Sequence, residues 1–387
     1  MTGDRAYLDY NASAPLLSEA RTAMLAALDA SANPSSVHGE GRSARRIVED
    51  ARREVAALVN TKPDHVVFTS GATEAASTLL TPEWRMGRGD VRMSRLYVSA
   101  ADHPCLLNGG RFSADRVTRI GVDGNGACDL AALASALAAH DRDEGLPLVA
   151  IHLANNETGV IQPVTDISAI VKSAGGVLVL DAVQAAGRIP LDLADGVADY
   201  LVLSSHKIGG PTGVGAFAAA SDLMMPRPLV TGGGQEKGFR AGTENLAGIA
   251  GFGAAAKVAR DNLEHAGELA AMRGRIEQII LSLAPDAEIF GRGAERLANT
   301  TFFAIPGLKA ETAQIGFDLA GVALSAGSAC SSGKVGPSHV LKAMGFDNDG
   351  ALRVSIGRGT TAKDIDLFAT ALAQMLARRA GRATKAA

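Results

Sequence analysis

The sequence predicts an α/β fold, with a mostly parallel sheet in a large domain and a smaller α+β domain beside it. The chain has 387 residues, which is more than one ordinary domain holds. Over its first half, short uninterrupted apolar runs alternate with stretches of helical periodicity. Such runs are typical of parallel strands that helices cover on both faces. We expect the large domain to span residues 15–262, and the small domain to combine residues 1–14 and 263–387.

The elements follow in order along the chain. Residues 18–29 have the pattern of a short amphipathic helix with Ser18 as its N-cap, and residues 44–58 carry apolar side chains at helical spacing. Short apolar runs then predict strands at residues 65–68, 96–98, 148–151, 177–180 and 200–203. In the last third, the pattern predicts Ala-rich helices, a strand, a helix and a final strand at residues 245–285, 300–304, 310–320 and 351–355.

Composition and charge exclude several classes of function. Apolar residues make up 47% of the chain. It has 38 Lys and Arg residues and 41 Asp and Glu residues, which give a formal net charge of −3. This nearly neutral charge does not favour nucleic acid or a membrane as a partner. No apolar run reaches the roughly eighteen residues of a membrane span, and the first residues lack the pattern of a secretory signal. The three cysteines have no metal-ligand or disulfide spacing. We therefore expect a reduced, cytoplasmic protein with no metal site.

Two polar segments follow predicted strands, where the ligands of parallel sheets bind. Phe68–Glu74 runs from a strand through Gly71 into a helix, and such a junction presents backbone N–H groups that suit a phosphate. Thr73 adds a hydroxyl donor there. Asp181 ends a buried strand, where a carboxylate needs a positive partner such as a protonated ring nitrogen. Gln184 follows three residues later.

A third segment places Lys207 after a buried strand, between Ser-Ser-His and a glycine-rich turn. A lysine in such a site has a lowered pKa and can form a Schiff base with an aldehyde. Taken singly, the three segments have ordinary explanations: a capped helix start, an aspartate that caps a turn, and a surface lysine. Together they match the needs of pyridoxal phosphate, whose phosphate is anchored, whose ring nitrogen is paired and whose aldehyde is trapped.

Segments spread over nearly the whole chain match the motifs of one family. They are Tyr7–Ala12, Asn33–Ser36, Thr69–Glu74, Asp102–Pro104, Asn155–Gly159, Asp181–Gln184, Ser205–Lys207, Arg240–Thr243, Ser325–Cys330 and Arg353–Ser355. With them the sequence resembles the cysteine desulfurases of the class V aminotransferase family, on the branch of the nitrogenase-type and housekeeping iron–sulfur enzymes. The resemblance implies a fold-type I pyridoxal phosphate-dependent transferase with a seven-stranded sheet in its large domain.

The resemblance also implies roles for residues around the ring of the cofactor. Lys207 would hold the cofactor covalently and take the Cα proton of the substrate. Asp181 would pair with the ring nitrogen, and Gln184 would bind the phenolic oxygen. His103 would stack on the ring and serve in proton transfer.

Further roles concern the phosphate and the substrate. The phosphate ligands would be the backbone amide of Ala72 and the side chains of Thr73, Ser204 and His206. Thr243 would reach the phosphate of the neighbouring subunit, which implies a homodimer. Asn156 and Arg353 would hold the substrate, with Arg353 as a bidentate fork for its α-carboxylate.

Cys330 lies in a Gly/Ser-rich stretch whose composition predicts a loop that can carry a thiolate into a site and out again. In the family, this cysteine attacks the sulfur of the bound substrate, which leaves a persulfide on the enzyme and releases alanine. We expect Cys105 to pack near the site and Cys128 to be incidental.

The predicted function is thus the conversion of L-cysteine to L-alanine, with sulfur passing to Cys330 and then to an acceptor protein such as an iron–sulfur scaffold. The alternative is a selenocysteine lyase, or another class V lyase or aminotransferase. Such enzymes share Lys207, Asp181 and His103 but do not need a mobile cysteine. A non-enzymatic scaffold with this fold would be expected to have lost these residues.

Overall fold

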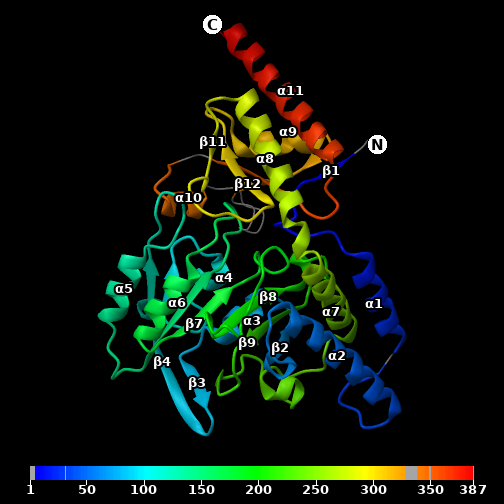
Figure 1. Cartoon of the computed structure of the whole chain (residues 1–387), viewed down its shortest axis with the longest axis vertical. Helices are drawn as coiled ribbons and strands as arrows, with labels where there is room; N and C mark the ends of the chain where they lie inside the picture. Colours follow the sequence, from blue (N-terminus) through cyan, green and yellow to red (C-terminus); the bar gives the residue numbers. More distant parts are fainter. Residues whose placement is uncertain (1–4, 31, 328–337, 348–349, 387) are drawn as a thin grey trace.

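The computed structural model describes residues 5–30, 32–327, 338–347 and 350–386. A large region built around a central sheet lies below a smaller region in Figure 1, and the long helix α11 (Ala362–Ala386) projects from the smaller one. In the described part of the chain, no helix is long and apolar enough to cross a membrane.

The central sheet has a mostly parallel path of seven strands, as predicted, in the order β5-β4-β6-β7-β8-β9-β2. Neighbours from β5 to β8 pair in parallel, and β9 is antiparallel to both of its neighbours. The strands are β2 (Val66–Thr69), β4 (Gly89–Ser99), β5 (Val117–Ile120), β6 (Leu146–His152), β7 (Val177–Asp181), β8 (Tyr200–Ser204) and β9 (Gly215–Ala219). Two antiparallel strands, β3 (Glu83–Met86) and β10 (Met224–Pro226), extend the sheet beyond β4.

Helices bury both faces of this sheet, which explains the uninterrupted apolar runs in the sequence. On β7, Leu178 and Leu180 join one apolar cluster, while Val177 and Val179 join another on the opposite face. The first cluster includes side chains of α2 (Gly39–Leu58), α5 (Leu130–Ala138), α6 (Val164–Ser173) and α7 (Leu246–Asp261). The second includes side chains of α3 (Ala72–Leu79) and α4 (Pro104–Leu107). Helix α1 (Ser18–Asp29) packs on α7 (Figure 1).

The small domain has an apolar core of its own. Its sheet has the order β11-β12-β15-β14 and is antiparallel throughout. These strands are β11 (Glu288–Ile289), β12 (Thr300–Ala304), β14 (Ser325–Ala326) and β15 (Leu352–Ser355). The helices are α8 (Ala266–Leu283), α9 (Ala310–Leu319), α10 (His339–Ala343) and α11.

The N-terminal residues belong to this second core. Strand β1 (Ala6–Tyr7) pairs in parallel with β13 (Val322–Ala323). Ala6 and Leu8 are both fully buried in the apolar cluster of the small domain. The domain limits at residues 14 and 262 stay a prediction.

The N-termini of the first two helices differ from the prediction. Ser18 is the first helical residue and not the cap; Leu17 holds the N-cap position without a side-chain hydrogen bond. The Ser18 hydroxyl instead donates to Glu19, 2.8 Å away. Helix α2 begins at Gly39, earlier than its apolar pattern, because His38 caps it by accepting from the Gly41 amide.

A buried ion pair fixes the short helix η4 (Gln235–Gly238), which precedes Thr243, against α2. Arg52 Nη1 and Nη2 each lie 2.7 Å from a carboxylate oxygen of Glu236. The exposed fractions of the two side chains are only 5% and 2%. Glu236 also accepts from the Phe68 amide at 2.8 Å, so the pair joins α2, β2 and η4.

We predict that Arg52→Met, which keeps most of the side-chain volume, lowers the free energy of unfolding by about 3–5 kcal/mol, because it leaves the Glu236 carboxylate buried without its cation. The measurement is equilibrium unfolding in urea. The matched control is Arg53→Met, since Arg53 pairs with Asp50 on the exposed side of the same helix and should contribute less than about 1 kcal/mol. Equal effects of the two substitutions would contradict this account.

Candidate active site

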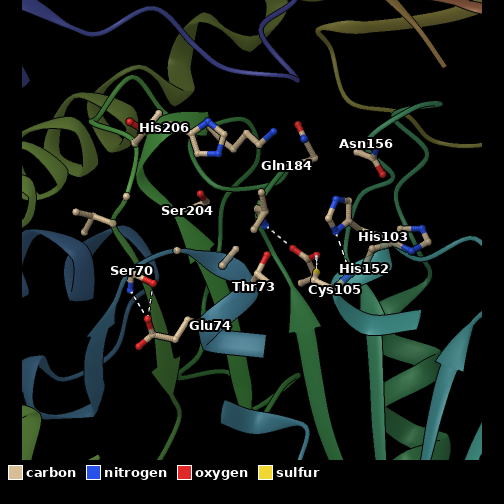
Figure 2. Close-up of a pocket in the computed structure, with 18 of the residues that line it drawn as sticks. Ser70, Thr73, Glu74, His103, Cys105, His152, Asn156, Gln184, Ser204 and His206 are labelled. Atoms are coloured by element: carbon tan, nitrogen blue, oxygen red, sulfur yellow. Dashed lines mark hydrogen bonds between the residues drawn. The ribbon is translucent and has the colours of Figure 1, made fainter. Parts of the chain in front are cut away.

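A cavity of about 340 Å³ opens at the carboxyl ends of the parallel strands (Figure 2). It brings together most of the site residues that the sequence predicts. They are Ala72, Thr73, His103, Asn156, Asp181, Gln184, Ser204, His206 and Lys207. Because β6, β7 and β8 are parallel neighbours, the polar residues that follow them meet at one edge of the sheet.

Lys207 ends the short helix η3 (Ser205–Lys207), directly after β8. Its Nζ donates to the backbone carbonyls of Asn11 and Ala12, at 2.6 and 2.8 Å. These acceptors come from the N-terminal segment, so a contact between distant parts of the chain holds the amine inside the cavity. The nearby positive charge of Lys207 also contributes to the low pKa of His103 and of His206.

Asp181 is the last residue of β7 and is 6% exposed. Burial raises its pKa, because a charged carboxylate loses hydration there. The Val183 amide offsets part of this effect by donating to Oδ1 at 3.0 Å. The carboxylate therefore lies where a cation on a ligand in the cavity would be favoured.

The opposite end of the cavity suits an anion. Helix α3 starts after Gly71, and no side chain caps it, so the amides of its first turn face the cavity beside Thr73 and Ser204. His206 Nδ1 lies 3.2 Å from the Ser13 hydroxyl. Burial, followed by the charge of Lys207, lowers the pKa of His206 to about 4, so its ring is neutral at pH 7.

His103 caps α4 through its side chain, since its Nδ1 accepts from the Cys105 amide at 3.2 Å. Burial, followed by the charges of Lys207 and His339, lowers its pKa to about 4. The ring is therefore neutral at pH 7. With Nδ1 engaged as an acceptor, the proton of the neutral ring is on Nε2.

Arg353 lies beside the cavity rather than in its lining. It is 1% exposed, and its Nη1 donates to the backbone carbonyl of Asn156 while Nη2 donates to Asp9, both at 2.9 Å. Its Nε has no hydrogen-bond partner in the described part of the chain. Gln184 Nε2 donates to the Asn11 carbonyl at 3.1 Å, which places its side chain next to Lys207.

One predicted residue of the phosphate site stands apart from the cavity. Thr243 is exposed and does not line it, although Arg240 Nε contacts Glu74 on α3 at 3.0 Å and so connects that segment to the phosphate-type turn. Cys330 falls within residues 328–337, outside the described residues. Its role therefore stays a prediction.

Glu157 is a buried residue that the sequence analysis did not assign. It is 1% exposed, and it accepts a hydrogen bond from the Ser338 hydroxyl at 2.5 Å. A side chain on Gly327 would come within 3.3 Å of its Oε2. Glu157 thus binds the first described residue after Cys330 and lies near the last one before it. Glu157 belongs to the family-matching segment Asn155–Gly159, and this membership could have identified it from the sequence.

His152 and Asp102 were also missed. Asp102 is fully buried and accepts hydrogen bonds from the amides of Ser99 and His152, at 2.7 and 2.8 Å, and its carboxylate also contacts the His152 ring. His152 ends β6 and lines the cavity. The rule that ligand-facing residues follow parallel strands, applied above to Asp181, could have found it.

Comparison with known proteins agrees with this geometry. The family described as Aminotransferase class-V matches residues 6–368. The chain belongs to that family. Cysteine desulfurase from Cereibacter sphaeroides is 39% identical over 372 residues, which cover 94% of this chain and 93% of that protein. Cysteine desulfurase from Frankia sp. is 40% identical over an alignment of 391 positions, which covers 96% of this chain and 91% of that protein.

The fold is also that of the family. The crystal structure of a NifS-like protein from Rickettsia africae superposes with a TM-score of 0.85 at 30% identity, and the match covers 96% of this chain and 99% of that one. A second NifS-like protein superposes with a TM-score of 0.83, also at 30% identity.

The cofactor of this family is pyridoxal phosphate, and the residues of the cavity fit it. Uncapped amides and hydroxyls stand at one end, where a phosphate needs donors. The buried carboxylate of Asp181 would pair with a protonated ring nitrogen. Lys207 supplies the amine that captures an aldehyde.

Glu157 yields a prediction about pH. Burial raises its pKa to about 7, whereas the unfolded chain has the ordinary value near 4.5. The stability of the folded protein therefore falls as pH rises through this interval, by about 3 kcal/mol over the whole titration. Glu157→Gln removes the ionisation, so its free energy of unfolding should fall less between about pH 5 and about pH 8 than that of the wild type.

The measurement is urea unfolding at several pH values, with Glu311→Gln, an exposed carboxyl on α9, as the control. The control should follow the wild-type pH profile. Parallel profiles for the wild type and Glu157→Gln would show that Glu157 does not take up a proton on folding.

Proposed function

We propose that this protein is a pyridoxal phosphate-dependent cysteine desulfurase, which converts L-cysteine to L-alanine and transfers the sulfur to its own Cys330. The observation that carries the proposal is the meeting of Lys207, Asp181 and His103 in one cavity. Relatives named cysteine desulfurase over nearly the whole chain support it.

Each residue of the cavity has a different role in the proposed reaction. Pyridoxal phosphate supplies an electron sink that makes the Cα–H and C–S bonds of an amino acid labile. The Lys207 amine takes the Cα proton. The neutral His103 ring, which carries its proton on Nε2, transfers a proton at the leaving sulfur. Asp181 keeps the ring nitrogen protonated.

The sulfur atom of the substrate passes to the side chain of Cys330. The Cys330 thiolate attacks the sulfur of the substrate, so a new S–S bond forms as the Cβ–S bond breaks. The carbon keeps the electron pair of that bond and gains a proton, which yields alanine and a persulfide on Cys330. An acceptor protein with a thiol or an iron–sulfur scaffold then takes the outer sulfur, and a reduced cytoplasmic compartment suits this chemistry.

We assign binding of the substrate carboxylate to Arg353 and Asn156. Two of the Arg353 nitrogens are engaged by Asp9 and by the Asn156 carbonyl, and its Nε has no partner among the described residues. A buried guanidinium with an unused donor can bind a carboxylate strongly.

Transfer to Cys330 is tested by incubating the purified holoenzyme with L-cysteine and weighing its peptides after digestion under non-reducing conditions. We expect the Cys330 peptide to gain the mass of one sulfur atom while alanine is released. Cys330→Ser should keep bound cofactor and lose this transfer, whereas the control Cys128→Ser, a buried residue outside the cavity, should keep it. Alanine formed without sulfur on Cys330 would instead indicate a lyase.

The proposed homodimer places Thr243 of one subunit at the phosphate of the other, in agreement with its exposure and its absence from the cavity of its own chain. Mixed dimers test this. A dimer of one Lys207→Ala subunit and one Thr243→Ala subunit has one fully intact site if Thr243 acts across the interface. We expect about half of the wild-type activity from such mixed dimers. No activity above that of the Thr243→Ala homodimer would contradict the arrangement.

A further inference from the structure

Cys105 contacts two residues of the site at once. It lies in the first turn of α4 and lines the cavity (Figure 2). Its amide donates to His103 Nδ1 at 3.2 Å, and its Sγ donates to Asp181 Oδ2 at 3.8 Å. The sequence alone predicts only packing at this position.

The carboxylate of Asp181 is thereby held from two sides. Oδ1 accepts from the Val183 amide, which belongs to the same stretch of chain, and Oδ2 accepts from Cys105, which comes from α4. A carboxylate with one partner on each oxygen cannot rotate about its last bond without breaking a hydrogen bond. This fixes the plane in which the carboxylate meets a ring nitrogen.

The thiol has the protonation state that a donor needs. Burial and the charges of Asp181 and Asp102 raise the pKa of Cys105 well above its usual value. A protonated thiol is a poor nucleophile, so Cys105 is suited to donate a proton in a hydrogen bond and not to accept sulfur.

We propose that Cys105 is a positioning residue for the cofactor, because its thiol donates to Asp181 Oδ2 and holds the carboxylate in the orientation that pairs with the ring nitrogen. The inference rests on the proposed function for the identity of the site, but it concerns binding of the cofactor and not the fate of the sulfur.

The test compares Cys105→Ala with Cys105→Ser. Both side chains are smaller than cysteine, but only serine has a hydroxyl that can donate a hydrogen bond. Apoprotein is titrated with pyridoxal phosphate, and the dissociation constant is read from absorbance. We expect roughly five- to tenfold weaker binding for Cys105→Ala, and binding within about twofold of the wild type for Cys105→Ser. The control Cys128→Ala should leave the constant unchanged.

A double variant separates the effect of the hydrogen bond from the effect of packing. In Asp181→Ala, which lacks the acceptor, adding Cys105→Ala should change the dissociation constant by less than about twofold. Equal weakening by Ala and Ser would mean that only the volume of Cys105 matters, and it would overturn the proposal. An added sulfur on the Cys105 peptide after incubation with L-cysteine would overturn it as well.

These results are independent of the desulfurase assignment. A holoenzyme that shows the Ala–Ser difference but does not release alanine from L-cysteine would refute the proposed function alone. A holoenzyme that forms the Cys330 persulfide but binds cofactor equally well in all Cys105 variants would refute the role of Cys105 alone.

Discussion

The burial of the Asp181 carboxylate at the carboxyl end of β7 is the constraint on which the site depends. Both faces of β7 are covered by apolar side chains, so a charge on this strand is tolerated only at its end. Even there, the loss of hydration raises the pKa of Asp181, and a backbone amide and a thiol donate to its two oxygens. A protonated ring nitrogen would complete the set and would orient the cofactor in the cavity.

The N-terminal segment joins this site to the small domain. The backbone carbonyl of Asn11 accepts from Lys207 and from Gln184, while its side chain donates to Thr300 at 2.9 Å and accepts from Asn299 at 3.0 Å. One residue therefore holds the reactive amine and also contacts β12 of the small domain. Because Arg353 lies on β15, next to β12, the position proposed for the substrate carboxylate depends on the same junction.

The small domain and the large domain also meet at Glu157. This buried carboxyl binds Ser338 and lies against Gly327, at the two described limits of the segment that contains Cys330. His339, the neighbour of Ser338, lies 2.8 Å from the backbone carbonyl of Asp102 through its Nε2. Helix α10 is thus attached to the large domain next to His103, and the ends of the segment that contains Cys330 are held close to the site.

From local patterns of apolarity and of turn residues, the sequence predicts the succession of strands and helices along the chain and the polar residues at strand ends. It therefore placed Lys207, Asp181 and the turn before α3 correctly. Which distant groups contact the site residues depends on the packing of the folded chain: the Asn11 carbonyl on Lys207, Cys105 on Asp181 and Asp9 on Arg353. These contacts join segments far apart in the chain, and the direction of each side chain is set by packing between layers rather than by its neighbours in sequence.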